Sequence, residues 1–439
     1  MTFSRYVALF FCLILSIHSA GGCAASAGKT RQLGPNHLFR PTRDAVISSP
    51  VAYDFDRDGS LEIAVGSWDT YFYLLDTHLN DLPGWPKHSR QGFFPTPALI
   101  DLDADGVPEI VTGSEAGRLY AWHWTGHTCP HFPIDFGYKI WASVTGLPGQ
   151  RMAVGHQGEM RLLDARGLPA EGWPQPIKGW PDATAAYADH TIAVTTLTPG
   201  DPSQGWVYAW RENGTLLPGF PVELPQDSDS SPALADLDRN GQLWIVFGDD
   251  NGLLHVLDLT GQERAGFPVR TFGPKPGPTP TPHPPGGNVY SIEASPAVAD
   301  LDGDGRSEIV VGSWDGRMYV WNDQGQLFPG WPVTVGDQII SSAALVDLDD
   351  DSRLDIIVGS KDHFLYGWTA AGDPLPGFPF DLGDQVFSSP WIGDLDGNGR
   401  ADVVVGANNG IHLLRDVGLL GRIAWPQFHN NDQNTGAAQ

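Results

Sequence analysis

Asp300-Leu-Asp302-Gly-Asp304-Gly305-Arg-Ser-Glu308 is an acidic stretch between two apolar runs, residues 294–299 and 309–311. Carboxylates stand at its positions 1, 3, 5 and 9, and glycine stands at position 6. Alternate carboxylates on a tight turn can direct their oxygens to one point. Ca²⁺ is bound in this way, by six to eight oxygens at about 2.3–2.6 Å. Gly305 can adopt the positive φ that the turn needs, so the stretch predicts a cation-binding turn between two β-strands.

Copies of this acidic loop recur along the chain. The predicted calcium ligands are Asp54, Asp56, Asp58 and Glu62 in the first unit; Asp101, Asp103, Asp105 and Glu109 in the second; Asp300, Asp302, Asp304 and Glu308 in the sixth; Asp347, Asp349, Asp351 and Asp355 in the seventh; and Asp394, Asp396, Asn398 and Asp402 in the eighth. The seventh loop has Ser352 in place of the glycine, which predicts a strained backbone there. The loop beginning at Asp236 has Trp244 at position 9, so we expect it to bind calcium weakly or not at all.

An EF-hand and an Asp-rich turn without an ion are two other interpretations of the loops. An EF-hand needs a bidentate glutamate at position 12 and flanking helices, but Val65 and Val311 occupy that position here. An Asp-rich turn without an ion is the second alternative, because Asp and Gly favour turns. Five complete copies favour about five Ca²⁺ sites, with a structural role rather than a catalytic or ligand-bridging one.

An aromatic-proline pair marks the repeat most regularly. The pairs begin at Trp85, Phe132, Trp173, Phe220, Phe267, Trp331, Phe378 and Trp425, at intervals of 47, 41, 47, 47, 64, 47 and 47 residues. The chain therefore contains eight units. The long interval contains a proline-rich segment, residues 273–287, which we expect to be an exposed insertion. The short interval belongs to the third unit, which like the fourth has no acidic loop.

Each unit reads as four short strands separated by turns rich in Gly, Asp and Asn. This pattern predicts an all-β fold, a single β-propeller of eight four-stranded blades, with seven blades as the alternative. A solenoid would require capping ends. Residues 37–43 instead resemble the fourth strand of the other units, and the last unit lacks one. We therefore expect the N- and C-terminal segments to pair and close the ring.

The first residues read as an export signal, because Arg5 precedes an apolar run that is too short to span a bilayer. The predicted division of the chain is a signal peptide at 1–22, a flexible linker at 23–36 and the propeller at 37–439. Ala20-Gly-Gly-Cys23 predicts lipidation of Cys23, whereas Ala25-Ser-Ala27 fits ordinary cleavage. We expect a protein at the bacterial cell surface or in the periplasm as a lipoprotein, or a secreted one.

The charge balance argues against nucleic acid as a partner, because the formal net charge is -26 and phosphate binding needs basic clusters. The chain has no G-x-S-x-G, H-E-x-x-H or C-x-x-C motif, and we predict no catalytic residue. His123, His127 and His131 lie near Cys129, where a zinc site is conceivable. A polar loop with Cys129 as a buried small side chain fits the spacing better.

The units resemble FG-GAP/VCBS repeats, the propeller repeats also found in the integrin α-subunit. The resemblance rests on the D-x-D-x-D-G-x-x-[DE] loops followed by strands such as Ile309-Val-Val-Gly312. It also rests on the ending from Trp425 to Gly436, which is similar to that of many bacterial members. It covers residues 37–436 and implies an exported, calcium-bound propeller that often acts in adhesion or recognition. Units 3 and 4 depart from the repeat, and integrin propellers have seven blades.

The sequence favours a binding or adhesion module for a surface protein or a glycan over an enzyme. The alternative is a propeller-fold enzyme, either a polysaccharide lyase or a quinoprotein-like dehydrogenase. Loop aromatics are candidate contacts, namely Trp68, Trp314, residues 138–141 and residues 179–182. Packing between blades is the alternative role for these rings. Membrane contact is expected only through the possible lipid anchor.

Overall fold

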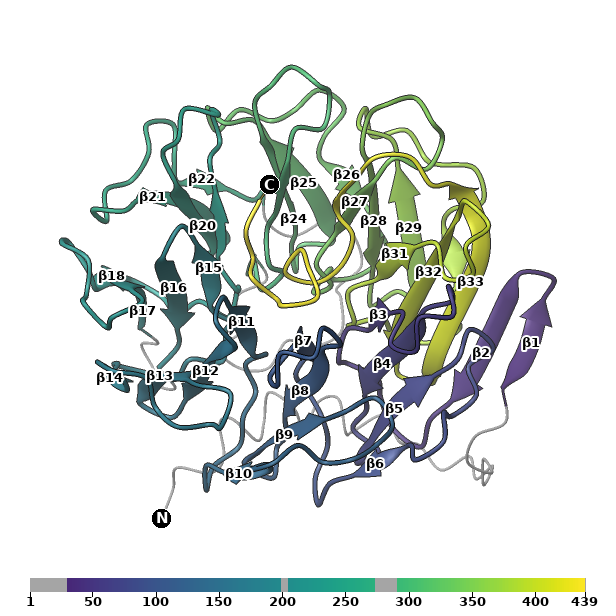
Figure 1. Cartoon of the computed structure of the whole chain (residues 1–439). Helices are drawn as coiled ribbons and strands as arrows, with labels where there is room; N and C mark the ends of the chain where they lie inside the picture. Colours follow the sequence, from purple (N-terminus) through teal and green to yellow (C-terminus); the bar gives the residue numbers. More distant parts are fainter. Residues whose placement is uncertain (1–29, 199–203, 273–289, 439) are drawn as a thin grey trace, which may run out of the picture.

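The computed structural model describes residues 30–198, 204–272 and 290–438, and every regular element in these ranges is a β-strand. The predicted signal peptide, Cys23 and the proline-rich insertion lie outside the described residues. The strands form eight sheets arranged as blades around a ring (Figure 1). Among the described residues, no helix is long and apolar enough to cross a membrane. The predicted eight-bladed propeller is confirmed.

Within each blade the strands follow one another outward from the axis in antiparallel order. The innermost strands are β3 (Val51–Tyr53), β7 (Ala98–Ile100), β11 (Thr145–Leu147), β15 (Ala186–Ala188), β19 (Ala233–Ala235), β23 (Ala297–Ala299), β27 (Ala344–Val346) and β31 (Trp391–Gly393). The second strands are β4 (Glu62–Gly66), β8 (Glu109–Gly113), β12 (Arg151–His156), β16 (Thr191–Thr196), β20 (Trp244–Gly248), β24 (Glu308–Gly312), β28 (Asp355–Gly359) and β32 (Arg400–Ala407).

The third strands are β5 (Tyr71–Leu75), β9 (Arg118–Trp122), β13 (Glu159–Leu163), β17 (Gly205–Arg211), β21 (Leu253–Asp258), β25 (Arg317–Trp321), β29 (Phe364–Trp368) and β33 (Gly410–Leu419). The outer strands are β6 (Lys87–His88), β10 (Ile134–Asp135), β14 (Gln175–Pro176), β18 (Val222–Leu224), β22 (Val269–Arg270), β26 (Val333–Thr334) and β30 (Phe380–Asp381) in blades 1 to 7. These seven short strands directly follow the aromatic-proline pairs, as the repeat spacing predicted.

The outer strand of blade 8 comes from the N-terminal segment. Strand β2 (His37–Pro41) pairs with β33 over five residues, from His37 opposite Leu414 to Pro41 opposite Gly410. The predicted closure of the ring is therefore confirmed. Strand β1 (Arg31–Gly34) pairs with β2 and extends this blade to five strands. Part of the segment that the sequence predicted to be a flexible linker is thus a strand.

The last aromatic-proline pair does not precede an outer strand. Trp425 ends strand β34 (Ile423–Trp425), which pairs with the innermost strand of blade 7, so that Trp425 lies opposite Leu345. Trp425 is 1% exposed. The eighth marker therefore belongs to the segment that fills the axis, which agrees with the expectation that the last unit lacks a fourth strand of its own.

Neighbouring blades pack face to face, and the apolar core lies between them. One apolar layer joins Ile63 and Val65 of blade 1 to Val404 and Leu413 of blade 8. The glycine that ends a second strand makes this approach possible. At Gly406, an added Cβ would lie 2.5 Å from both the Val46 backbone oxygen and Val46 Cγ1 of the loop that leads into blade 1. The glycine of the I-V-V-G pattern is therefore a packing requirement between blades.

A ring of hydroxyl groups surrounds the axis where the innermost strands are entered. In each of seven contacts, a backbone amide donates to the Ser or Thr hydroxyl of the next blade at 2.9–3.2 Å. We call Ser49, Thr96, Ser143, Thr184, Ser231, Ser295, Ser342 and Ser389 the hydroxyl ring. The contact from Ser389 to Ser49 joins the last blade to the first. Ser-Ser-Pro recurs at residues 48–50, 230–232 and 388–390, and its second serine belongs to this ring.

The C-terminal segment, residues 426–438, fills the axis beyond the hydroxyl ring (Figure 1). The innermost strands are sheet edges, so their inward amides need acceptors. The amides of Leu99, Gly146, Tyr187 and Leu234 donate to the carbonyls of residues 432, 433, 435 and 436, each at 2.7 Å. His429 is fully buried, and its ring nitrogens lie 2.8 Å from the carbonyls of Asn434 and Pro232. This segment ties successive blades together.

A buried histidine in blade 5 makes the stability of the fold depend on pH. Burial alone would lower the pKa of His255, but hydrogen bonds and charge attraction from Asp249 and Glu263 outweigh it and raise the pKa to about 9. A raised pKa means that the folded state binds the proton more tightly. The stabilisation is therefore complete below about pH 6.5 and is lost as the pH rises through 9, at a cost of about 3 kcal/mol.

We expect His255→Asn to remove this pH dependence. The difference in unfolding free energy between wild type and variant should shrink between pH 6.5 and 9.5, as measured by urea titration. His78→Asn is the control, because His78 is exposed. A constant difference over this range would contradict the assigned charge on His255.

Candidate calcium loops

The acidic loops all connect the innermost strand of a blade to its second strand, so they lie at one end of the propeller. Position 1 directly follows the innermost strand, and position 9 begins the second strand in every such blade except blade 8, as in Asp54 and Glu62 around β3 and β4. In blade 8, Asp402 is the third residue of β32. Blades 3 and 4 have short turns at this place, residues 148–150 and 189–190. The strands therefore hold both ends of each loop.

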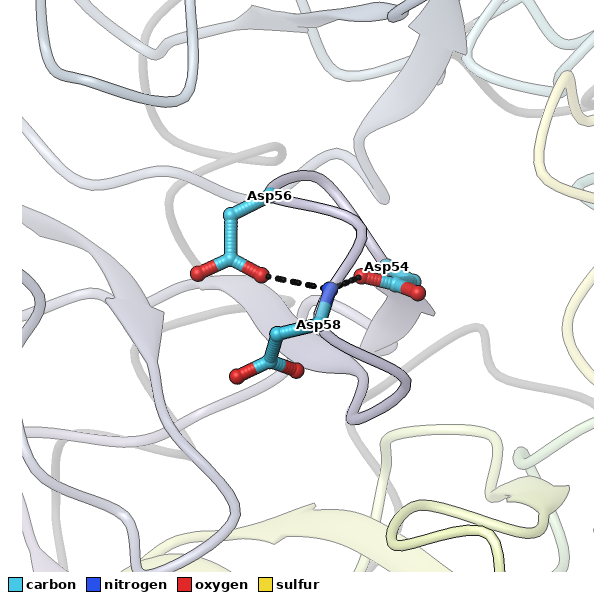
Figure 2. Close-up of side chains that lie close together, drawn as sticks. All are labelled: Asp54, Asp56 and Asp58. Atoms are coloured by element: carbon cyan, nitrogen blue, oxygen red, sulfur yellow. Dashed lines mark hydrogen bonds between the residues drawn. The ribbon is translucent and has the colours of Figure 1, made fainter.

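In the loops of blades 1 and 2, the acids at positions 1, 3 and 5 fold the turn by accepting backbone hydrogen bonds. In blade 1, the two oxygens of Asp54 accept from the amides of Asp58 and Gly59, each at 3.0 Å. Asp56 Oδ1 also accepts from the Asp58 amide, at 3.1 Å (Figure 2). Asp58 Oδ1 in turn accepts from the Ser60 amide at 2.8 Å. Asp56 and Asp58 each keep a second oxygen that makes none of these turn contacts.

The acid at position 9 closes the loop by accepting a hydrogen bond from the backbone amide of position 2. Glu62 Oε2 accepts from the Phe55 amide at 2.9 Å, and Glu109 Oε2 accepts from the Leu102 amide at 2.7 Å. The same contact forms at Glu308, Asp355 and Asp402. These carboxylates are buried. One oxygen of the position-9 acid is thus used by the backbone.

Burial and the neighbouring acids raise the pKa of these position-9 groups. Burial is the larger cause, and the three acids of the same loop add to it. The pKa rises to about 7 for Glu62, Glu109 and Asp355 and to about 8 for Glu308. The raised values mean that each loop holds more negative charge than its surroundings stabilise, and a bound cation would relieve this.

The backbone of each loop takes positive φ at two positions. At position 6, φ is 93° for Gly59 and for Gly305. Ser352 stands at the same position in blade 7 with φ 70°, as the sequence predicted. A non-glycine residue in this region costs about 1–2 kcal/mol. Position 4 also has positive φ, 62° at Arg57, a requirement that the sequence analysis missed.

The carboxylates of four loops converge. In each set the potential ligand oxygens lie within 4.8 Å of one another: Asp54, Asp56 and Asp58; Asp101, Asp103 and Glu109; Asp300, Asp302 and Asp304; and Asp347, Asp349 and Asp351. Clustered carboxylate oxygens on a turn with fixed backbone suit a hard cation such as Ca²⁺, with water completing the shell. The residues present therefore fit the cation that the repeat implies.

An arginine pairs with an acid of the blade 5 loop. Arg264 Nη2 lies 2.5 Å from Asp238 Oδ1 and 3.1 Å from Asp323 Oδ2. Its guanidinium carbon lies 4.6 Å from the centre of the Trp244 ring, the residue at position 9. The hydrogen bonds from Arg264 lower the pKa of Asp238. This loop has no acid at position 9, and Arg264 supplies a positive charge to the acid that it contacts.

The loop of blade 8 is intermediate. Arg415 Nη1 lies 2.8 Å from Asp396 Oδ2. Both oxygens of Asp402 accept backbone amides, those of Leu395 at 3.1 Å and Asp416 at 3.0 Å. A cation here would compete with Arg415. Nothing in the sequence signalled the roles of Arg264 and Arg415, because both lie far from their loops along the chain.

The histidines near Cys129 form a hydrogen-bonded turn. The Thr125 hydroxyl lies 2.7 Å from His123 Nδ1 and 2.9 Å from His127 Nδ1. Cys129 packs against the core between blades 2 and 3, and burial raises the pKa of its thiol to about 12. The structure agrees with the polar-loop interpretation, with Cys129 as a partly buried small side chain.

The loop aromatics lie at the opposite end of the propeller from the acidic loops. Trp314 is buried, whereas Trp68, Trp141 and Trp180 are half-buried. Residues 138, 139, 141, 155–157 and 180–182 line an open pocket. Packing accounts for Trp314. Trp141 Nε1 donates to Glu115 Oε1 at 3.1 Å, and Trp141 and Trp180 both line this pocket.

A family model described as an FG-GAP-like repeat matches residues 300–358, which include the loops of blades 6 and 7. The protein is a β-propeller with an FG-GAP-like repeat. No curated protein matches the chain.

The solved structure of Sqt1 agrees with this FG-GAP-like propeller in fold. Sqt1 of Saccharomyces cerevisiae superposes with a TM-score of 0.63 at 12% identity, covering 88% of this chain and 98% of Sqt1. BamB from Moraxella catarrhalis gives a TM-score of 0.49 at 13% identity, covering 79% of this chain and 92% of BamB. At these identities the similarity concerns the fold alone.

Proposed function

We propose that the protein is an exported, calcium-stabilised β-propeller that acts as a binding or adhesion module for a protein or glycan partner. The FG-GAP-like propeller fold supports a binding module. The export proposal rests on the basic and apolar pattern of residues 1–22, with Cys23 as the candidate lipidation site.

One observation carries the calcium proposal. Four loops bring three carboxylates together within 4.8 Å, and no neighbouring arginine pairs with Asp56 or Asp58 in the way that Arg264 pairs with Asp238 among the described residues. Acids that crowd together without a counter-charge repel one another. A divalent cation in each loop would remove this repulsion and fix the turn between two strands. The proposed role of calcium is therefore structural, and the acids belong to the scaffold.

We expect Asp302→Ala to remove one bound calcium ion and leave the others. The acids of this loop accept hydrogen bonds mainly from amides of the same loop, and Arg239 of blade 5 also reaches Asp300 at 3.2 Å, so the loops of the other blades should bind calcium independently. The measurement is calcium content by equilibrium dialysis at fixed free calcium. Asp238→Ala is the matched control, because Arg264 already neutralises that acid. Loss of all calcium from the Asp302 variant, or unchanged content, would contradict the proposal.

A further inference from the structure

One residue of each blade stands two residues before the hydroxyl ring, in the loop that leads into the innermost strand. These residues form what we call the mouth ring: Ile47, Phe94, Trp141, Asp182, Asp229, Glu293, Ile340 and Phe387. Each is half-buried, while the residues directly before and after it are buried. Because the hydroxyl ring surrounds the axis, its neighbours at constant spacing form a second ring. The C-terminal segment bonds to residues that follow the hydroxyl ring in sequence, so it lies on the opposite side of the hydroxyl ring from the mouth ring.

The mouth ring divides into two arcs. Blades 7, 8, 1, 2 and 3 contribute the apolar arc, Ile340, Phe387, Ile47, Phe94 and Trp141. Blades 4, 5 and 6 contribute the acidic arc, Asp182, Asp229 and Glu293. The repeat imposes the same backbone position on all eight residues, so the segregation is a property of the side chains alone. A ligand on the axis would meet carboxylates on one side and apolar groups on the other.

The acidic arc is crowded. Carboxylate oxygens of Asp229, Glu293 and Asp250, which follows strand β20, lie within 4.8 Å of one another. Burial raises the pKa of Asp229, and Glu293, Asp227 and Asp182 raise it further. The charges that act on Asp229 are thus all negative. This arc is electrostatically suited to an added positive charge.

Two aromatic residues of the apolar arc, Trp141 at one end and Phe387 next to the other end, already hold ammonium groups against their rings. Lys139 Nζ lies 3.7 Å from the centre of the Trp141 ring, and Lys361 Nζ lies 5.7 Å from that of Phe387. Lys139 also interacts with Asp182, and Lys361 with Glu293. Each border of the acidic arc therefore pairs a cation with an aromatic face and a carboxylate. At the centre of the acidic arc, Asp229 and the carboxylates next to it can attract an external cation.

We propose that the mouth ring binds an organic cation with an apolar body, an ammonium or guanidinium group meeting the acidic arc and the body resting on the apolar arc. The inference deepens the proposed binding function and does not depend on the calcium loops, which lie at the other end of the molecule. Charge attraction combined with cation–π contact favours such ligands. A basic side chain of a protein partner would present this chemistry at the axis.

The test uses two probes of equal length, 4-phenylbutylamine and the neutral 4-phenylbutanol, with the full chain in 1 mM CaCl₂. Saturation-transfer NMR suits the millimolar affinity that small ligands reach. We expect the alcohol to bind at least tenfold more weakly than the amine. Asp229→Asn combined with Glu293→Gln should weaken the amine at least tenfold and leave the alcohol unchanged. These changes relieve repulsion, so the variant is expected to fold, as its melting temperature will show.

Two controls keep the result specific. Glu171→Gln combined with Asp373→Asn removes the same charge from exposed sites elsewhere and should not alter binding of the amine. Asp302→Ala should lose calcium and retain the amine, which separates this inference from the calcium proposal. Equal binding of the two probes, no binding of either, or equal weakening by both double variants would overturn the proposal.

Discussion

Chelation with EGTA is expected to lower the melting temperature by several degrees. Calcium that binds only to the folded chain stabilises it by RT ln(1 + [Ca²⁺]/Kd). Extracellular calcium modules have Kd values of about 0.1–1 mM, so each site at 1 mM calcium contributes about 0.4–1.4 kcal/mol. Five independent sites would together contribute about 2–7 kcal/mol. The measurement is differential scanning calorimetry with 1 mM CaCl₂ and with EGTA.

The calcium effect should be specific to the ion that the loops fit. Mg²⁺ demands near-ideal octahedral geometry at about 2.0–2.1 Å and dehydrates reluctantly, so adding it after EGTA should restore little of the lost stability. Adding excess Ca²⁺ should restore all of it. An unchanged transition in EGTA would show that the loops do not hold a stabilising ion.

Gly406→Ala is expected to destabilise the protein by about 3 kcal/mol, at the upper end of the usual cost of overpacking. The added Cβ would lie 2.5 Å from the Val46 backbone oxygen, which has no rotamer to adopt, and 2.5 Å from Val46 Cγ1. Blade 8 would have to move away from blade 1, where the ring closes. The measurement is unfolding free energy from denaturant titration.

Gly158→Ala is the matched control for this substitution. Gly158 has φ +76°, and an added Cβ would meet nothing within 4 Å. The change should cost about 1 kcal/mol, the left-handed strain less the gain from a stiffer unfolded chain. If the two variants were equally destabilised, close packing between blades 8 and 1 would not explain the glycine at position 406.

The sequence was sufficient to predict the ring and its closure. Local signals, namely the aromatic-proline spacing and alternating strands, repeat eight times, and residues 37–43 matched a missing outer strand. The pairing of Trp425 with the innermost strand of blade 7 was not predicted, because its dipeptide matches the repeat while its surroundings do not. Strand β1 was missed because Arg31–Gly34 is largely exposed and carries no repeat pattern.

The candidate sites were predictable only where neighbours in sequence are neighbours in space. Each acidic loop is nine residues long, so its ligands could be named from spacing. Arg264 reaches Asp238 from 26 residues away, and no local pattern announces that pair. The mouth ring is composed of one residue from each blade, and it becomes visible only when the blades are superposed around the axis.

The central claim is that the FG-GAP-like loops hold calcium, and direct counting tests it. Protein equilibrated in 1 mM CaCl₂ should be analysed for bound calcium against a matched dialysate. The account predicts about five ions for each chain, with the eighth-blade site the weakest because Arg415 competes for Asp396. Protein that retains no calcium above the dialysate would contradict it.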